Sequence, residues 1–159
     1  MKLLLYSHFL SPSVVVGSDS SAGYSAEIEQ RQLQGRVTFA GETADILTYY
    51  SAADIYVAPS LEDSFNLPAL EAMACGLPVI LSSSAGMSDY VKDGVDALLL
   101  RNPQDADELA VALQRLLADP SSLRASIGSN ASQTAALFSW DRHAEEIHRL
   151  LRDAAVHRA

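Results

Sequence analysis

Two carboxylates near the middle of the chain, Asp63 and Glu71, are separated by seven residues. The apolar pattern predicts a helix over Leu67 to Cys75, with Asp63 in the loop ahead of it and Glu71 about one turn inside it. Glu71 is the only charged residue between Leu67 and Leu81. A helix this apolar is normally buried on most of its faces. Because a buried carboxylate without a partner is costly, we expect a hydrogen-bond donor beside Glu71.

The residues between the two acids, Ser64 to Leu67, lead into this helix. Pro68 falls in the first turn, where a missing N–H does no harm. The free amides there and the positive end of the helix dipole suit an anion such as a phosphate. Two carboxylates beside such a site suit a sugar joined through a diphosphate to a ribose, because carboxylates accept hydrogen bonds from hydroxyls. The spacing alone favours a plainer alternative, in which Asp63 caps a turn and Glu71 points into solvent.

Apolar runs and amphipathic stretches alternate along the chain, which predicts an α/β fold with a doubly wound, mainly parallel, Rossmann-like sheet and a helical C-terminal third. The predicted strands are Leu3 to Phe9, Ser13 to Gly17, Arg36 to Ala40, Asp54 to Ala58, Pro78 to Leu81 and Ala97 to Leu100. The predicted helices are Ser21 to Leu33, Thr43 to Ala52, Leu67 to Cys75, Asp105 to Leu117, Ser121 to Phe138 and Asp141 to His157, with a short turn at Ser88 to Lys92. In such folds ligands bind beyond the carboxyl ends of the strands, and Asp63 follows the strand that ends at Ala58.

The join between the first two predicted strands is unusually short. Leu10 to Ser13 leaves too few residues for the helical crossover that parallel neighbours need. The first strand must therefore form an antiparallel hairpin, lie at an edge of the sheet, or belong to a neighbouring chain.

Size and charge exclude several classes of function. The 159 residues are enough for one domain, 1–159, and too few for two. A net charge of -9, with eleven Lys and Arg dispersed along the chain, argues against a nucleic-acid partner. This acidity is typical of a cytoplasmic protein. The single Cys75 cannot form an internal disulfide, and no run of residues is apolar enough for a transmembrane segment.

Two further signals have structural interpretations. Asp105-Ala106-Asp107 has the D-x-D pattern of some metal sites, but it opens an amphipathic helix, where acidic residues favour the N-terminus. We therefore predict no metal site there. Trp140 could stack on a sugar, and we expect instead that it anchors the last helix to the core, with Ser139 as the N-cap.

An ordered series of motifs resembles the C-terminal, donor-binding half of retaining glycosyltransferases of the GT-B fold, a family that includes bacterial mannosyl- and glucosyltransferases. The segments that carry the resemblance are VTFAG at 37–41, YYSAADIYVAPS at 49–60, FNLPALEAMACGLPVI at 65–80, and Asp93-Gly94 ahead of ALLL at 97–100. The resemblance covers the chain from about Val14 to its C-terminal residue.

In that family the two acids of an E-x7-E motif bind the nucleotide sugar. The resemblance implies that Glu71 holds the ribose hydroxyls and that Asp63 takes the place of the first glutamate facing the donor sugar. It also implies that the amides of Phe65, Asn66 and Leu67 meet the diphosphate and sugar. The implied donor-binding residues are Asp63, Ser64, Phe65, Asn66, Leu67 and Glu71, with no catalytic residue, metal ligand or cofactor assigned. The chain departs from the motif in having Asp63 for glutamate, and Ser64 and Asn66 where glycines are common.

A larger departure lies at the start of the chain. Family members carry an Arg and a Lys in a Gly-Arg-Leu…Lys-Gly segment, and this sequence has no counterpart, because Gly35-Arg36 precedes a different strand. Residues 1–13 instead resemble the first strand of the missing N-terminal half, and residues 14–159 the nucleotide-sugar donor-binding domain. We therefore expect an internally truncated hexosyltransferase that binds a nucleotide-diphosphate sugar, with weak or no transfer to a saccharide or lipid acceptor.

Two other interpretations stay open. One is a non-catalytic, degenerate nucleotide-binding or oligomerisation module. The other is a GT-B epimerase, whose histidine-centred chemistry finds no matching residues. The last helix of the family packs on the missing half, so its apolar stripe of Ile147, Leu150, Leu151 and Ala154 should be partly exposed and favour a homo-oligomer.

Overall fold

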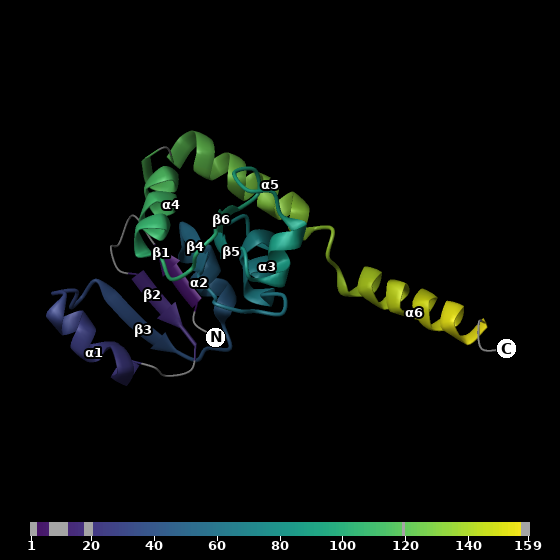
Figure 1. Cartoon of the computed structure of the whole chain (residues 1–159), viewed down its shortest axis with the longest axis horizontal. Coiled ribbons are helices and arrows are strands. Elements are labelled where there is room, and N and C mark those ends of the chain that lie inside the picture. The colour runs from purple at the N-terminus through teal and green to yellow at the C-terminus, as the bar shows by residue number, and fades with distance from the viewer. Residues whose placement is uncertain (1–2, 7–12, 18–20, 119, 157–159) are drawn as a thin grey trace.

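A six-stranded sheet lies at the centre of the computed structural model, which describes residues 3–6, 13–17, 21–118 and 120–156 (Figure 1). The strands lie in the order β3-β2-β1-β4-β5-β6. Their bounds are β1 Leu3–Tyr6, β2 Ser13–Val16, β3 Val37–Gly41, β4 Ile55–Ala58, β5 Val79–Ser82 and β6 Leu98–Leu100. The α-helices are α1 Ser21–Gln30, α2 Ile46–Ala52, α3 Leu67–Ala74, α4 Ala106–Ala118, α5 Ala125–Ala135 and α6 Trp140–Val156. A 3-10 helix, η1 (Gly86–Tyr90), and a π-helical turn, η2 (Pro120–Arg124), complete the described elements.

The direction of β1 sets it apart from the other strands. It pairs antiparallel with β2 on one side and with β4 on the other, whereas the β2–β3, β4–β5 and β5–β6 pairs are parallel. The short join between the first two strands is thus explained by antiparallel pairing, and β1 lies inside the sheet rather than at its edge. Its predicted extension to Phe9 falls outside the described residues. The prediction of a mainly parallel sheet is confirmed.

Alternate residues of β4 show how the sheet is covered on both faces. Tyr56 and Ala58 pack with buried residues of α2, α3 and α5, whereas Ile55 and Val57 pack with α4. All four side chains are buried, as expected for a strand covered on both faces.

The first helix covers the outer part of the sheet. Tyr24 of α1 stacks on Phe39 of β3, with ring centroids 6.4 Å apart. Ala40, the next residue, packs on the side of α2 and α3. Because successive strand residues point to opposite faces, α1 and α3 lie on opposite faces of the sheet. The doubly wound arrangement predicted from the sequence is confirmed.

Local capping explains where several elements begin and end. Asp45 accepts a hydrogen bond from the Thr48 amide, so α2 begins at Ile46, later than predicted. Gly76, at φ 77°, ends α3 close to the predicted boundary at Cys75, because its left-handed backbone suits glycine. The helix predicted over Ser121 to Phe138 is instead divided into η2 and α5.

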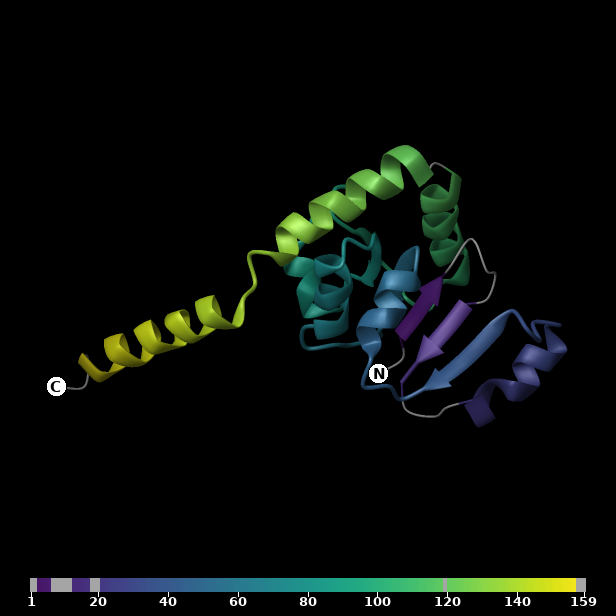
Figure 2. The same ribbon diagram turned by 180° about the vertical axis from the view of Figure 1, so that it is seen from behind.

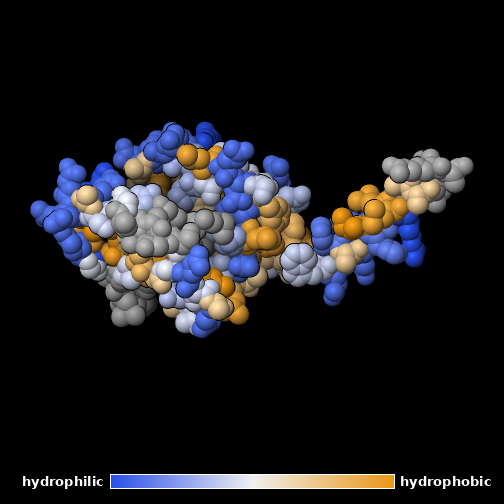
Figure 3. All heavy atoms as spheres, turned by 90° about the horizontal axis from the view of Figure 1, so that it is seen from below, coloured by the Kyte–Doolittle hydropathy of each residue, from blue (hydrophilic) through white to orange (hydrophobic). Residues whose placement is uncertain are grey.

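The last helix projects away from the body of the molecule (Figures 1 and 2). The Ser139 hydroxyl accepts a hydrogen bond from the Arg142 amide, which confirms the predicted N-cap. Trp140 is 77% exposed, so the prediction that it anchors this helix to the core is wrong. The predicted apolar stripe is exposed, with Leu151 66% exposed, and Figure 3 shows hydrophobic residues gathered along one side of the helix.

Within the described ranges, no helix is both long and apolar enough to cross a bilayer.

Candidate functional site

The loops after β4 and β5 are joined to each other at the carboxyl edge of the parallel strands. Asp63 forms an isolated parallel bridge with Ala85. The Gly86 amide donates to the Asp63 carbonyl at 3.0 Å, and the Met87 amide donates to the Phe65 carbonyl at 2.9 Å. These bonds hold the segment that leads into α3, so the predicted site residues lie on a fixed piece of backbone.

Glu71 has the donor that its apolar surroundings led us to expect. The hydroxyl of Tyr50, in α2, donates to Glu71 Oε2 at 3.0 Å, and it also lies 3.3 Å from the Pro68 carbonyl oxygen. Tyr50 is only 1% exposed. Burial, followed by the hydrogen bond to Glu71, raises the pKa of the Tyr50 phenol far above its ordinary range. The phenol therefore stays protonated and remains a donor to the carboxylate.

The helix that carries Glu71 is less buried than its composition predicts. Ala69, Ala72 and Met73 are buried, whereas Leu67 and Glu71 are exposed. The expectation that most faces of α3 are buried is thus wrong for the face that carries Glu71. An exposed stripe runs along this face, and its carboxylate can meet a ligand from solvent.

Asn66 begins α3 in a backbone conformation that few residues adopt. Its φ is 78°, in the left-handed region that favours glycine, and asparagine tolerates this region better than most residues. Its Oδ1 accepts a hydrogen bond from the Ala69 amide at 3.1 Å, and the Tyr56 hydroxyl lies 3.5 Å from the same oxygen. Asn66, which stands where glycine is common in related sequences, therefore keeps the turn and adds a helix cap.

The amides of this segment divide into engaged and free donors. The Phe65 amide donates to Asp63 Oδ1 at 3.1 Å, which closes a small turn. Among the residues that the structure describes, the amides of Asn66 and Leu67 have no acceptor. Both features of the plainer alternative are thus present, since Asp63 caps a turn and Glu71 is exposed. The free amides at the helix N-terminus nevertheless leave a place for an anion.

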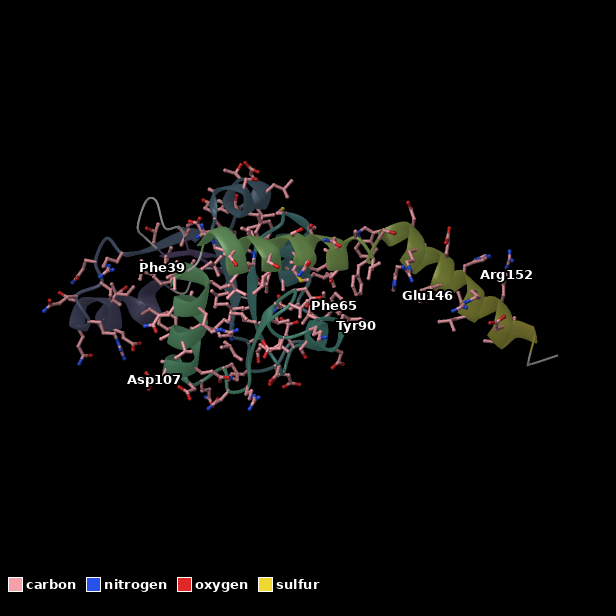
Figure 4. All side chains as sticks on the ribbon, turned by 90° about the horizontal axis from the view of Figure 1, so that it is seen from above. Phe39, Phe65, Tyr90, Asp107, Glu146 and Arg152 are labelled. Carbon is pink, nitrogen blue, oxygen red and sulfur yellow. The ribbon has the colours of Figure 1, made fainter. Side chains whose placement is uncertain are left out.

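The Phe65 ring of this segment packs in a cluster of three aromatic rings. Phe65 is 5.9 Å from Tyr90 and 5.9 Å from Phe138, measured between ring centroids, and Tyr90 and Phe138 meet edge to face at 5.2 Å. Figure 4 shows Phe65 and Tyr90 close together near the C-terminal end of α5. Tyr90 of η1 is 56% exposed, so the cluster is open to solvent on the side of η1.

The reversed strand β1 changes the edge of the sheet where ligands of such folds bind. The strand order matches the Rossmann order 3-2-1-4-5-6, in which the central strand normally leads into a phosphate-binding turn and a helix. Leu4 pairs with Val57 and Tyr6 with Ile55, so the beginning of β1 lies at the carboxyl end of β4. The central strand therefore supplies no strand-to-helix turn at this edge, where the N-terminus of α3 lies.

Sequence reasoning missed two residues of the site. Tyr50 lies in the segment YYSAADIYVAPS, but nothing in its spacing linked it to Glu71, which follows twenty-one residues later. Gly86 was not singled out, although a Cβ atom there would collide with the Ser64 carbonyl oxygen. A glycine in the segment that follows a buried strand was the available signal, because glycine often marks close backbone approach.

The D-x-D pattern has the structural role predicted for it. Asp105 Oδ1 accepts hydrogen bonds from the amides of Asp107 and Glu108, at 2.9 and 3.2 Å, and so caps α4. Over the described ranges, no three His, Cys, Asp or Glu side chains are grouped as a metal site would require.

Comparison with known proteins places this geometry in a family. Residues 12–134 match the family model described as glycosyl transferases group 1. The chain is 36% identical over 146 residues to a D-inositol 3-phosphate glycosyltransferase of Corynebacterium jeikeium, covering 86% of this chain and 34% of that protein. The chain thus spans about a third of the length of the curated relatives it matches.

Solved structures show the same likeness. Sucrose-phosphate synthase from Thermosynechococcus elongatus superimposes with a TM-score of 0.81 at 36% identity, over 92% of this chain and 40% of that one. HepE of Anabaena, solved in complex with UDP, has a TM-score of 0.81 at 28% identity, over 90% of this chain and 41% of that one. With a family match over most of its length and relatives of the same fold, the chain belongs to the group 1 glycosyl transferases, which have the GT-B fold.

Proposed function

We propose that this chain is the nucleotide-sugar donor-binding half of a retaining glycosyltransferase that transfers a hexose from a nucleotide-diphosphate sugar to a saccharide or lipid acceptor. The observation that carries the proposal is the placement of Glu71 and the free amides of Asn66 and Leu67 together at the carboxyl edge of parallel strands. Support comes from HepE, which has been solved with UDP and with UDP-glucose.

The proposal gives separate roles to the acidic side chains and to the free amides of the site. Glu71 accepts hydrogen bonds from the ribose hydroxyls through the oxygen that Tyr50 leaves free. The amides of Asn66 and Leu67, with the dipole of α3, meet the diphosphate. Asp63 and Ser64 face the donor sugar. The Asp63 carboxylate accepts a hydrogen bond from the Phe65 amide, which fixes its position.

Transfer by this chain alone should be weak or absent. Glycosyl transfer needs a stabilised diphosphate leaving group and an acceptor held beside the sugar. The dipole of α3 supplies part of the first requirement, whereas the Arg and Lys of related transferases have no counterpart in the sequence. The reversed β1 occupies the central place in the sheet. Robust turnover by the purified chain would contradict this part of the proposal.

The proposal is tested by titration calorimetry with UDP, GDP and ADP on the wild-type chain and on Glu71→Ala. We expect one nucleotide to bind the wild type. Glu71→Ala should bind this nucleotide at least about tenfold more weakly, because hydrogen bonds to a charged group are strong. Thermal unfolding of both chains controls for loss of the fold. If no nucleotide binds at millimolar concentration, the donor-site proposal fails.

A second candidate is a non-catalytic, degenerate nucleotide-binding or oligomerisation module, which the exposed stripe of α6 favours. In that case we expect concentration-dependent self-association in sedimentation experiments. Leu151→Gln should weaken the association, and Arg152→Gln, on the same helix, should leave it unchanged. A chain that stays monomeric at high concentration would contradict the oligomerisation part.

A further inference from the structure

We propose that Tyr50 is a positioning residue of the donor site, which holds the Glu71 carboxylate so that one of its oxygens is presented to the ribose. The inference rests on the function proposed above. It goes beyond that function because it assigns a role to a residue of another helix, α2, which has no place in the predicted set of donor-binding residues.

The geometry joins a fixed donor to an exposed acceptor. Tyr50 is 1% exposed, and its hydroxyl donates to Glu71 Oε2 at 3.0 Å. Glu71 itself is exposed on the outer face of α3. An exposed glutamate samples several rotamers, and a ligand must stop that motion when it binds. A buried phenol that holds Oε2 removes much of this motion beforehand, and it leaves Oε1 free.

The phenol is itself held in place. The ring of Tyr50 lies 6.2 Å from the ring of Tyr56, which is fully buried beneath the site. The helix that carries Tyr50 is fixed at its start by Asp45, whose carboxylate accepts from the amide and the hydroxyl of Thr48 at 3.3 and 2.6 Å. The contact at 3.3 Å with the Pro68 carbonyl oxygen ties the same hydroxyl to the first turn of α3.

Because burial keeps the pKa of Tyr50 well above neutral pH, the hydroxyl donates at every pH at which the chain would bind a nucleotide. A phenylalanine at position 50 would keep the ring and its packing and would remove only the donor. The carboxylate of Glu71 would stay in place but lose its fixed orientation.

The test is a cycle of two variants and two ligands. The variants are Tyr50→Phe and Tyr49→Phe, which remove a hydroxyl from neighbouring positions of α2. Among the described residues Tyr49 has no hydrogen-bond partner for its hydroxyl, so it is a matched control. The ligands are UDP and a UDP analogue that lacks both ribose hydroxyls, and affinities are measured by titration calorimetry.

We expect Tyr50→Phe to weaken UDP binding about five- to tenfold, because it removes the hydrogen bond to the charged Glu71 carboxylate, and hydrogen bonds to charged groups are strong. The affinity for the analogue should stay unchanged, because the analogue makes no ribose contact with Glu71. Tyr49→Phe should bind both ligands like the wild type. In a chain that already carries Glu71→Gln, Tyr50→Phe should change the affinity for UDP much less than it does in the wild type.

Several outcomes would overturn the inference. An equal loss for UDP and the analogue would show a merely structural role for Tyr50, and no loss for either would show no role. If the wild type binds UDP and the analogue equally well, the contact between Glu71 and the ribose is wrong. If the wild type binds no nucleotide, the proposed function and the inference both fail. If Tyr50→Phe is unfolded at the titration temperature, the same cycle in trimethylamine N-oxide, which favours the compact state, decides the question.

Discussion

Gly86 lies directly against the carbonyl oxygen of Ser64, so that a Cβ atom at position 86 would collide with it. Gly86 begins η1, which follows β5, and Ser64 lies in the loop after β4. The amide of Gly86 also donates to the Asp63 carbonyl of that loop. We predict that Gly86→Ala forces these loops apart and lowers the free energy of unfolding by about 1–3 kcal/mol. Urea denaturation measures the loss, and UDP titration should show weaker binding.

Gly23→Ala is the control for this prediction. Gly23 lies in α1, with no atom within 4 Å of the position that a Cβ would take. Alanine should raise the free energy of unfolding there by up to about 1 kcal/mol, because glycine is a poor helix former. If both variants change stability alike, close approach at Gly86 is not the cause.

The left-handed backbone of Asn66 predicts an unusual order of stability among its variants. Asn66→Gly keeps the φ of 78° without strain and loses the hydrogen bond that the Ala69 amide donates to Asn66 Oδ1. Asn66→Ala loses that bond and adds a strain of about 1–2 kcal/mol. We therefore expect the glycine variant to be the more stable of the two in urea denaturation. An alanine variant as stable as the glycine variant would contradict the observed turn.

Asp63 combines a turn cap with the proposed sugar contact, and the two roles can be separated. Asp63→Asn keeps an oxygen that can accept from the Phe65 amide, so the loop and the affinity for UDP should be preserved. The affinity for UDP-glucose should fall by about three- to tenfold, because the charge-assisted hydrogen bond to the sugar is lost. Asp63→Ala should weaken the binding of both ligands. Equal losses for both ligands in Asp63→Asn would argue against a sugar contact.

Two buried tyrosines predict how stability depends on alkaline pH. Burial raises the pKa of Tyr50 and of Tyr56 above the ordinary value of about 10. The folded chain therefore binds these protons more tightly than the unfolded chain. Their contribution to stability is fully present below about pH 10 and is lost at higher pH, by up to about 1.4 kcal/mol per pH unit for each tyrosine.

The measurement is urea denaturation at a series of pH values between about 8 and 11. At the lowest pH of the series, Tyr50→Phe should have a smaller free energy of unfolding than the wild type. As the pH rises toward the top of the series, its free energy of unfolding should fall less steeply than that of the wild type. Equal slopes for the two chains would show that Tyr50 does not titrate abnormally.

Much of the fold could be predicted because its signals are local. The strands β4 and β5 and the helix that ends near Cys75 follow from short stretches of sequence, and the structure confirms them. The place of β1 is different, because its position depends on register with β4, some fifty residues away. The sequence allowed the antiparallel hairpin but could not decide between an interior and an edge position.

The site shows the same division between local and distant contacts. The loop and helix of the two carboxylates were predicted from spacing, and the structure places both residues at the carboxyl edge. The partner of Glu71 could not be predicted, because Tyr50 reaches it from another helix across the fold. The amphipathic pattern of α6 was visible, but the exposure of Trp140 depends on where the helix is placed.

The most direct test of the donor site is the dissociation constant of UDP for three purified chains: wild type, Glu71→Gln and Glu62→Gln. Glu62 is an exposed carboxylate of the same loop and controls for the change in net charge. We predict that the wild type and Glu62→Gln bind UDP with similar affinity and that Glu71→Gln binds it about tenfold more weakly, because it loses a charged acceptor for the ribose hydroxyls. Equal binding by wild type and Glu71→Gln, or no binding by the wild type at millimolar UDP, would contradict the assignment of this edge of the sheet as a nucleotide-sugar site.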